Sequence, residues 1–182
     1  PHPMSDKKVL YIIVCAAGPA GDVWNLIDIA QEHEWTVQVV STPKALSFLD
    51  IADLETRTGL AVRSEHRSSP QPRSPRADAI IIAPASFNSV NKLANGIADT
   101  YALDIANECI GLGVPTTILP YVNTAYASRK PFRESVQKLR EEGASVLICD
   151  DGFVPHEPGS GSEPHASFPW SRALQEIEAR KA

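Results

Sequence analysis

Five short runs of apolar residues recur along the chain, and branched side chains fill most of their positions. In the runs at 8–15 and 79–83 nearly all apolar residues stand at consecutive positions, which is typical of strands buried on both faces of a sheet. We therefore expect strands over residues 8–15, 36–40, 79–83, 114–119 and 144–149.

The segments between these runs space their apolar residues three or four positions apart, which indicates helices with one buried side. They cover residues 22–33, 88–94, 99–112, 131–142 and 170–182. Thr42 and Pro43 suggest the capped start of one more short helix, because threonine and proline suit those two positions. Strands that alternate with helices predict an α/β protein with a doubly wound parallel sheet.

Two stretches rich in proline, serine or glycine interrupt this order, at residues 64–76 and 150–169. The first holds three prolines and no apolar residue, so we expect both to be mobile loops. A length of 182 residues fits a single domain, which we place at residues 7–182. Residues 1–6 surround the only methionine, Met4, and are expected to be a tag remnant or disordered start.

The composition is ordinary for a globular protein, with 43% hydrophobic and 21% charged residues. A formal net charge of −5 argues against a nucleic-acid partner. No apolar run approaches the roughly 20 residues that cross a bilayer, and no signal-peptide pattern is visible. We expect a cytoplasmic protein without a membrane partner.

The chain has three cysteines, Cys15, Cys109 and Cys149, and their long spacings match no metal-ligand pattern. We therefore predict no metal site. The three thiols are interpreted as small buried groups in a reducing compartment, with Cys149 in the fifth strand.

Candidate chemistry lies in the turns that follow the strands, because open parallel sheets bind ligands beyond the carboxyl ends of their strands. Small or hydrogen-bonding residues are enriched there, which suits close contact with a phosphate at helix N-termini. These turns cover residues 16–21, 41–43, 84–91 and 120–126. No G-x-G-x-x-G follows the first strand and no P-loop motif occurs, so plain strand-to-helix turns remain an alternative.

One segment is more specific: residues 83–99 read APASFNSVNKLANGIAD. This stretch resembles the APASANT…K-A-x-G-I-A-D signature of the flavin-dependent cysteine decarboxylases, which include phosphopantothenoylcysteine decarboxylase and the peptidyl-cysteine decarboxylases of lantibiotic-type pathways. Residues 41–43 (STP), 58–59 (TG) and 120–126 (PYVNTAY) are similar to further motifs of that family. The likeness covers about residues 7–148 and is strongest at 77–99.

The resemblance implies a flavodoxin-like fold, bound FMN and a homotrimer or higher homo-oligomer. It implies that FMN oxidises a cysteine-type thiol carboxylate to a thioaldehyde, after which carbon dioxide leaves and an enethiol remains. Catalytic positions would be Asn88, Asn123 and His66, and the substrate would contact Asn123 and Tyr126. The implied FMN contacts are Ala17, Gly18, Ser41, Thr42, Ser86, Phe87, Asn88, Ser89 and Val90.

The phosphate loop and the base depart from the family pattern. Ala16-Ala17 replaces a Gly-Ser pair, and Asp22 brings a negative charge toward the expected phosphate. The family's basic histidine falls on Pro70, so His66, four residues earlier, is either its substitute or a solvated loop residue.

The substrate clamp and the late flap also differ. Val122 and Tyr126 replace two methionines of the clamp. The late flap at 158–165 has no cysteine, and its neighbourhood offers His156 and His165, either as surface residues or as a cap over the substrate.

Three functions stay open at this point. The first is an FMN-dependent decarboxylase of a C-terminal peptidyl cysteine or a phosphopantothenoylcysteine-like compound, and the lack of an attached synthetase domain shifts the expectation from pantothenate metabolism toward a peptide or other specialised substrate. The second is an FMN-binding or interaction protein with altered catalysis. The third is another flavin-dependent lyase or transferase of this fold, which Asn88 and Asn123 argue against.

Overall fold

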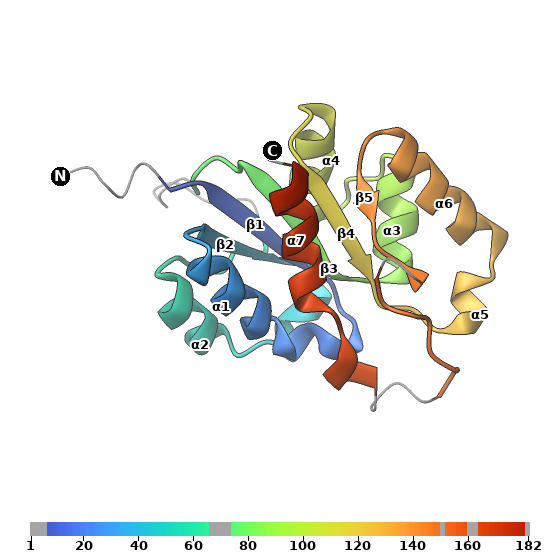
Figure 1. Ribbon diagram of the computed structural model, residues 1–182, viewed down its shortest axis with the longest axis horizontal. Coiled ribbons are helices and arrows are strands. Elements are labelled where there is room, and N and C mark those ends of the chain that lie inside the picture. Colours follow the sequence, from blue (N-terminus) through green and yellow to red (C-terminus); the bar gives the residue numbers. More distant parts are fainter. Residues whose placement is uncertain (1–6, 66–73, 150–151, 160–163, 181–182) are drawn as a thin grey trace.

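The computed structural model describes residues 7–65, 74–149, 152–159 and 164–180, and Figure 1 shows one sheet with helices around it. All strand pairs are parallel, and the strand order is β2-β1-β3-β4-β5. The strands are β1 (Val9–Val14), β2 (Thr36–Ser41), β3 (Ala79–Ala85), β4 (Thr116–Pro120) and β5 (Ser145–Val146). The predicted doubly wound parallel sheet is confirmed.

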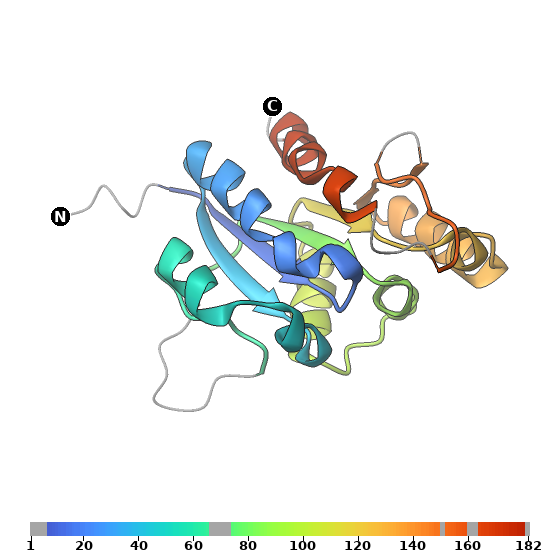
Figure 2. The ribbon, with the colours of Figure 1, turned by 90° about the horizontal axis from the view of Figure 1, so that it is seen from below.

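Figure 2 shows helices on both sides of the sheet. The α-helices are α1 (Trp24–Glu32), α2 (Ile51–Thr58), α3 (Phe87–Ala94), α4 (Tyr101–Gly111), α5 (Thr124–Ala127), α6 (Lys130–Glu141) and α7 (Trp170–Arg180). The short 3-10 helices are η2 (Gly18–Asp22), η3 (Pro43–Phe48) and η5 (Pro164–Ser167).

The core forms two clusters, one on each face of the sheet, because successive strand residues point to opposite faces. On β1, Leu10 and Ile12 pack with α1 and α7, whereas Tyr11 and Ile13 pack with α3, α4 and α6. Both faces of the central strands are therefore apolar, which explains the unbroken hydrophobic runs in the sequence.

Local signals account for several helix boundaries. Thr42 caps η3 as predicted, since its hydroxyl oxygen accepts a hydrogen bond from the Ala45 amide at 3.3 Å. Asp50 caps α2, and Gly59 ends that helix with a φ of 74°. A left-handed residue at this position favours glycine because it has no Cβ.

The fifth strand is shorter than predicted, and this changes the interpretation of Cys149. Strand β5 contains two residues, and Cys149 lies beyond it, exposed and with a φ of 60°. The chain turns after Ile148, which forms an isolated bridge with Phe153. The prediction that Cys149 is buried within a strand was therefore wrong, while Cys15 and Cys109 are buried.

The two predicted loops are only partly described. Residues 1–6, His66 and Pro70 lie outside the described residues. In the second loop, Phe153 and Phe168 are buried, so parts of that segment pack on the core.

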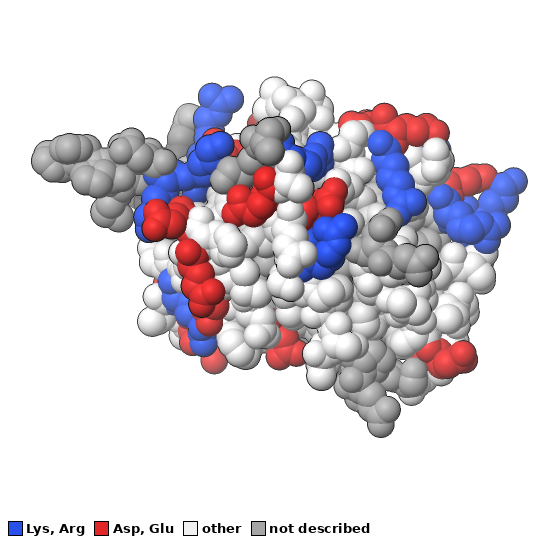
Figure 3. Space-filling view, in the orientation of Figure 1, with Lys and Arg blue, Asp and Glu red and all other residues white. Residues whose placement is uncertain are grey.

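Figure 3 shows acidic and basic side chains interspersed over the upper part of one face of the molecule. Among the described residues, no helix is long and apolar enough to cross a bilayer.

Candidate functional site

Two adjoining cavities lie where the chain leaves β1 and β3, at the point where successive connections run to opposite sides of the sheet. Ligands bind at such switch points in open α/β sheets. The first, which we call the aromatic cavity, has a volume of about 340 Å³. The second, the polar cavity, has about 330 Å³. Both are within the usual size range of ligand sites, and Ala16, Ser86 and Asn88 line both.

Ring side chains form much of the aromatic cavity. Phe87 stacks on Tyr126 with ring centroids 4.6 Å apart, and it is backed by Phe132 at 5.6 Å. Tyr121, which sequence reasoning missed, lines the cavity next to His156, with their ring centroids 4.7 Å apart. Burial raises the pKa of Tyr121, so its phenol stays neutral at physiological pH. The cavity therefore offers flat apolar walls to a planar ligand.

Asn123 presents an oriented amide to the aromatic cavity. It follows β4 and caps α5, because its Oδ1 accepts a hydrogen bond from the Tyr126 amide at 2.9 Å. Its Nδ2 has no hydrogen-bond partner among the described residues. An amide nitrogen held in this way can donate to a carboxylate in the cavity.

The polar cavity is lined by hydroxyl and ammonium groups. Thr42, Ser89 and Thr100 supply hydroxyl groups, and Lys44 and Lys92 supply ammonium groups. Lys92 pairs with Asp99 at 2.7 Å, whereas exposed Lys44 forms no ion pair with a described residue. This donor set suits an anion. Lys44, Lys92 and Thr100 were missed from the sequence, although Lys44 directly follows the predicted 41–43 turn.

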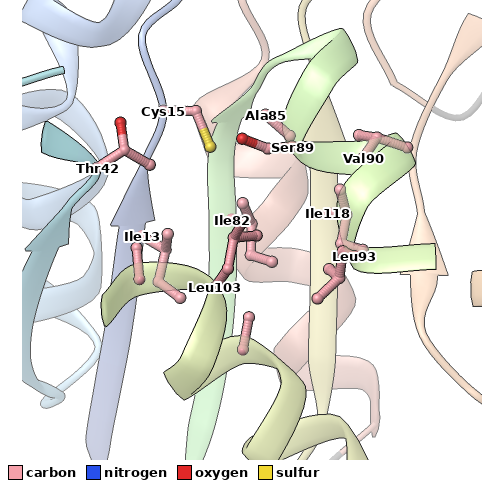
Figure 4. Close-up of a pocket in the computed structure, with 12 residues that line it drawn as sticks. Ile13, Cys15, Thr42, Ile82, Ala85, Ser89, Val90, Leu93, Leu103 and Ile118 are labelled. Carbon is pink, nitrogen blue, oxygen red and sulfur yellow. The ribbon is translucent and has the colours of Figure 1, made fainter. Parts of the chain in front are cut away.

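Three predicted cofactor contacts line neither cavity. Ser41 is fully buried and donates its hydroxyl hydrogen to the Thr42 carbonyl at 2.8 Å. Val90 lies on the inner side of α3 in a core cavity of about 10 Å³, which is too small for a cofactor (Figure 4). Gly18 faces His165, whose Nε2 would be 2.1 Å from a Cβ at that position. Ser41 and Val90 miss the cavities because their side chains point into the core, and Gly18 misses them because the loop that carries His165 packs against it.

The remaining implied cofactor contacts reach a cavity. Ala17 and Phe87 line the aromatic cavity, and Thr42 and Ser89 line the polar one. Ser86 also caps α3, since its Oγ accepts a hydrogen bond from the Ser89 amide at 3.1 Å.

The predicted catalytic and substrate positions are also brought together where the structure describes them. Asn88 lines both cavities, and Asn123 and Tyr126 line the aromatic cavity. His66 lies outside the described residues.

Asp22, which the sequence placed near the expected phosphate, lies away from both cavities. It lines a separate hollow together with His165 and Trp170, so its carboxylate lines neither cavity.

The thiol of Cys15 is buried and protonated. Burial raises its pKa more than hydrogen bonding with Ser89 and Ser86 lowers it. Figure 4 shows that thiol directed toward Ser89. A buried, protonated thiol is a poor nucleophile, so we assign Cys15 to the core.

The sequence left two interpretations of His156 open, a surface residue or part of a cap over the substrate. It lies in a segment that reads as an irregular loop, yet it lines the aromatic cavity beside Tyr121. Only packing of that segment against the end of β4 brings it there.

Comparison with known proteins places these features in context. The chain is 29% identical over 155 residues to the coenzyme A biosynthesis bifunctional protein CoaBC of Haemophilus influenzae, covering 79% of this chain and 38% of that protein. The chain thus spans well under half the length of that relative.

Solved structures share the fold. A PPC decarboxylase variant complexed with pantothenoylaminoethenethiol has a TM-score of 0.71 and 22% identity, over 94% of this chain and 99% of the other. The FMN-dependent cysteine decarboxylase TvaF from thioviridamide biosynthesis has a TM-score of 0.70 and 21% identity, over 94% and 98%.

The model of one protein family, described as Flavoprotein, matches residues 1–164. That range includes the 83–99 segment and every described residue that lines the two cavities. The resemblance seen in the sequence is confirmed: the chain belongs to the Flavoprotein family.

Proposed function

We propose that the protein binds FMN across the two adjoining cavities, with its phosphate in the polar cavity and its ring system in the aromatic cavity. One observation carries the proposal: a cationic, hydroxyl-lined hollow joins an aromatic-lined one at the switch point between β1 and β3. FMN has the same two-ended chemistry, and it occupies this switch point in flavodoxin.

The residues present fit the cofactor even though Ala16-Ala17 replaces the hydroxyl-bearing pair of the family. Thr42, Ser89 and Thr100 offer hydroxyl groups in the polar cavity, and Lys44 offers an ammonium group without an ion-pair partner among the described residues. A charge-assisted hydrogen bond is roughly twice as strong as a neutral one, so Lys44 compensates for the missing hydroxyl.

The proposed reaction is the oxidative decarboxylation of a cysteine-type thiol carboxylate. FMN when bound supplies the two-electron oxidation of the carbon that carries sulfur, and this oxidation gives the electrons of the departing carboxylate a place to go. Asn123 holds the carboxylate through its amide nitrogen, and Asn88 reaches both cofactor and substrate from the junction of the cavities.

The walls of the aromatic cavity favour the loss of carbon dioxide. The stacked pair Phe87 and Tyr126 lies on the same cavity as Asn123. Apolar surroundings are less favourable to a carboxylate than to neutral carbon dioxide. Tyr126 and Val122 also make this pocket differ from one with two methionines. The likeness to PPC decarboxylase and to cysteine decarboxylases supports a C-terminal peptidyl cysteine or a phosphopantothenoylcysteine-like compound as the substrate.

We further propose a cytoplasmic homotrimer or higher homo-oligomer. The free thiols of Cys15, Cys109 and Cys149 support a reducing compartment. Tyr126 supports an oligomer because this large residue is 50% exposed at the site, where a neighbouring subunit would cover it.

The proposed function is tested by the visible spectrum of the purified protein before and after FMN is added, followed by carbon dioxide release. The substrates to screen are peptides with a C-terminal cysteine and phosphopantothenoylcysteine, with serine-ended peptides as controls. Flavin bands and release from a thiol substrate alone are expected. A protein that ignores added FMN would refute the proposal, and bound FMN without turnover would point to an FMN-binding interaction protein.

A further inference from the structure

His156 is fixed at the wall of the aromatic cavity by its own backbone. Its carbonyl oxygen accepts a hydrogen bond from the Thr124 amide at 2.8 Å, and it forms a parallel bridge with Asn123. Both residues line the same cavity. The imidazole therefore lies beside the amide to which the proposed function assigns the substrate carboxylate.

The ring itself is held by aromatic contacts. It packs at 4.7 Å from Tyr121 and 6.2 Å from Phe153, measured between ring centroids. Its Nδ1 is buried and has no hydrogen-bond partner among the described residues. An unsatisfied buried polar atom is unfavourable and uncommon, and a functional role is one recognised reason for such an atom to persist.

We propose that His156 is the proton carrier of the reaction, which makes this inference dependent on the proposed function. The imidazole accepts the thiol proton as the S–H bond of the substrate breaks, and bound FMN would take the hydride released from the C–H bond of the adjacent carbon, which becomes a thioaldehyde. The bond to the carboxylate then breaks and carbon dioxide leaves; its bonding electrons form a carbon–carbon double bond, and a C=S electron pair moves to sulfur. The imidazolium returns its proton to that sulfur to give the enethiol, and an electron acceptor such as dioxygen would reoxidise the flavin before the next turnover.

The geometry favours this histidine for chemical reasons. Imidazole exchanges a proton near neutral pH, and a general base must first be within reach of the group it deprotonates. A substrate carboxylate at Asn123 leaves its thiol, two carbons away, within the same cavity. His66, which the sequence suggested for the base, lies on a different segment outside the described residues.

The first test compares His156→Gln with His165→Gln. His165 belongs to the same aromatic cluster, with its ring 5.5 Å from that of Tyr121, but it lines a different hollow. General acid–base groups contribute roughly 10²–10⁴-fold, so we expect His156→Gln to lower kcat by at least about 100-fold per bound flavin, with a much smaller change in KM. His165→Gln should keep turnover within a fewfold of wild type.

Chemical rescue separates proton transfer from a structural role. In His156→Ala, added imidazole should restore turnover in proportion to its concentration, because it can occupy the space of the lost ring. An equal concentration of pyrrole, which has a similar shape but no basic nitrogen, should restore none. Equal rescue by both compounds, or none by either, would assign His156 to packing.

A binding measurement gives a readout that does not depend on turnover. The ligand is a thiol analogue of the substrate that cannot lose carbon dioxide, and its binding is measured by calorimetry in two buffers of different ionisation enthalpy. The difference between the two binding enthalpies gives the number of protons released to solvent. Wild type should retain the thiol proton, whereas His156→Gln should release it to the buffer or bind the neutral thiol more weakly.

The outcomes distinguish this inference from the proposed function. If wild type releases carbon dioxide and His156→Gln does so at the same rate, the proton-carrier role is overturned and the proposed function stands. If His66→Gln abolishes turnover while His156→Gln spares it, the base is His66. If wild type releases no carbon dioxide from any thiol substrate, both proposals fall.

Discussion

At the scale of single residues, the proposed function gives the amide of Asn123 two tasks, one in the structure and one in ligand binding. The oxygen caps α5 through the Tyr126 amide, while the nitrogen has no partner among the described residues. The two tasks can be separated by substitution, because a carboxylate preserves the cap and lacks the donor.

We predict that Asn123→Asp leaves the urea unfolding midpoint close to wild type and raises KM at least about tenfold, since a second carboxylate repels that of the substrate. Asn123→Ala should raise KM as well and lose about 1 kcal/mol of stability with the cap. Steady-state kinetics and urea titration measure both effects. An Asp variant with wild-type KM would show that the substrate carboxylate binds elsewhere.

Lys44 is the residue that we propose to hold the phosphate of FMN. Replacing it with alanine removes the ammonium group without an ion-pair partner from the polar cavity, so FMN should bind roughly tenfold more weakly at low salt. The difference in FMN affinity between wild type and Lys44→Ala should narrow as salt screens the exposed ammonium group. Flavin fluorescence titration measures both affinities, and Lys130→Ala on α6 is the control with an equal change in charge. Identical FMN affinity in the two variants would place the phosphate outside the polar cavity.

At the scale of elements, α7 is attached to the end of the sheet by polar contacts. Glu176 accepts hydrogen bonds from Ser145 at 2.9 Å and from Arg172 at 3.0 Å. Arg180 donates to the carbonyl oxygens of Thr116 and Gly143. These contacts link α7 to the first residues of β4 and β5 and to Gly143, just before β5.

The pKa of Glu176 supports a pH prediction. Burial raises it, but hydrogen bonds with Ser145 and Arg172 and the nearby arginines outweigh that effect, so the pKa lies below its ordinary 4.5. The unfolded chain therefore binds the proton first as pH falls, and the contribution to stability is present above pH 4.5 and lost below it. We expect Glu176→Gln to lower the urea midpoint at pH 7 and to differ little from wild type well below pH 4.5.

A matched control exists on the surface. Glu134 is exposed and 3.7 Å from Lys130, so Glu134→Gln should change the midpoint little at either pH. If Glu176→Gln behaves like this control at pH 7, the contacts of Glu176 do not stabilise α7.

At the scale of the whole molecule, the two cavities open to solvent on the monomer, and Tyr126 stands half exposed at one of them. We predict that light scattering gives a mass three times that of the chain, or a multiple of it. A subunit that covers Tyr126 would also reduce its modification by tetranitromethane at high protein concentration. A monomer mass with fully reactive Tyr126 would contradict the proposed assembly.

Much of the architecture could be predicted from the sequence because its causes are local. Consecutive branched residues mark a strand buried on both faces, and Thr42 with Pro43 marks a helix start in any context. The same holds for the turns that became the site, since every parallel strand ends at the same edge. The segment 83–99 added the family and the chemistry that residue spacing alone did not specify.

Only the tertiary structure decided which side chains reach the cavities. Ser41 and Val90 belong to predicted contact segments, yet the pleat of β2 and the turn of α3 point them into the core. His156 is 33 positions from Asn123 in sequence and adjacent to it in the fold, because the segment after β5 pairs back onto the end of β4. Local patterns determine elements, whereas contacts between distant residues depend on how those elements pack, and the proposed proton carrier depends on such a contact.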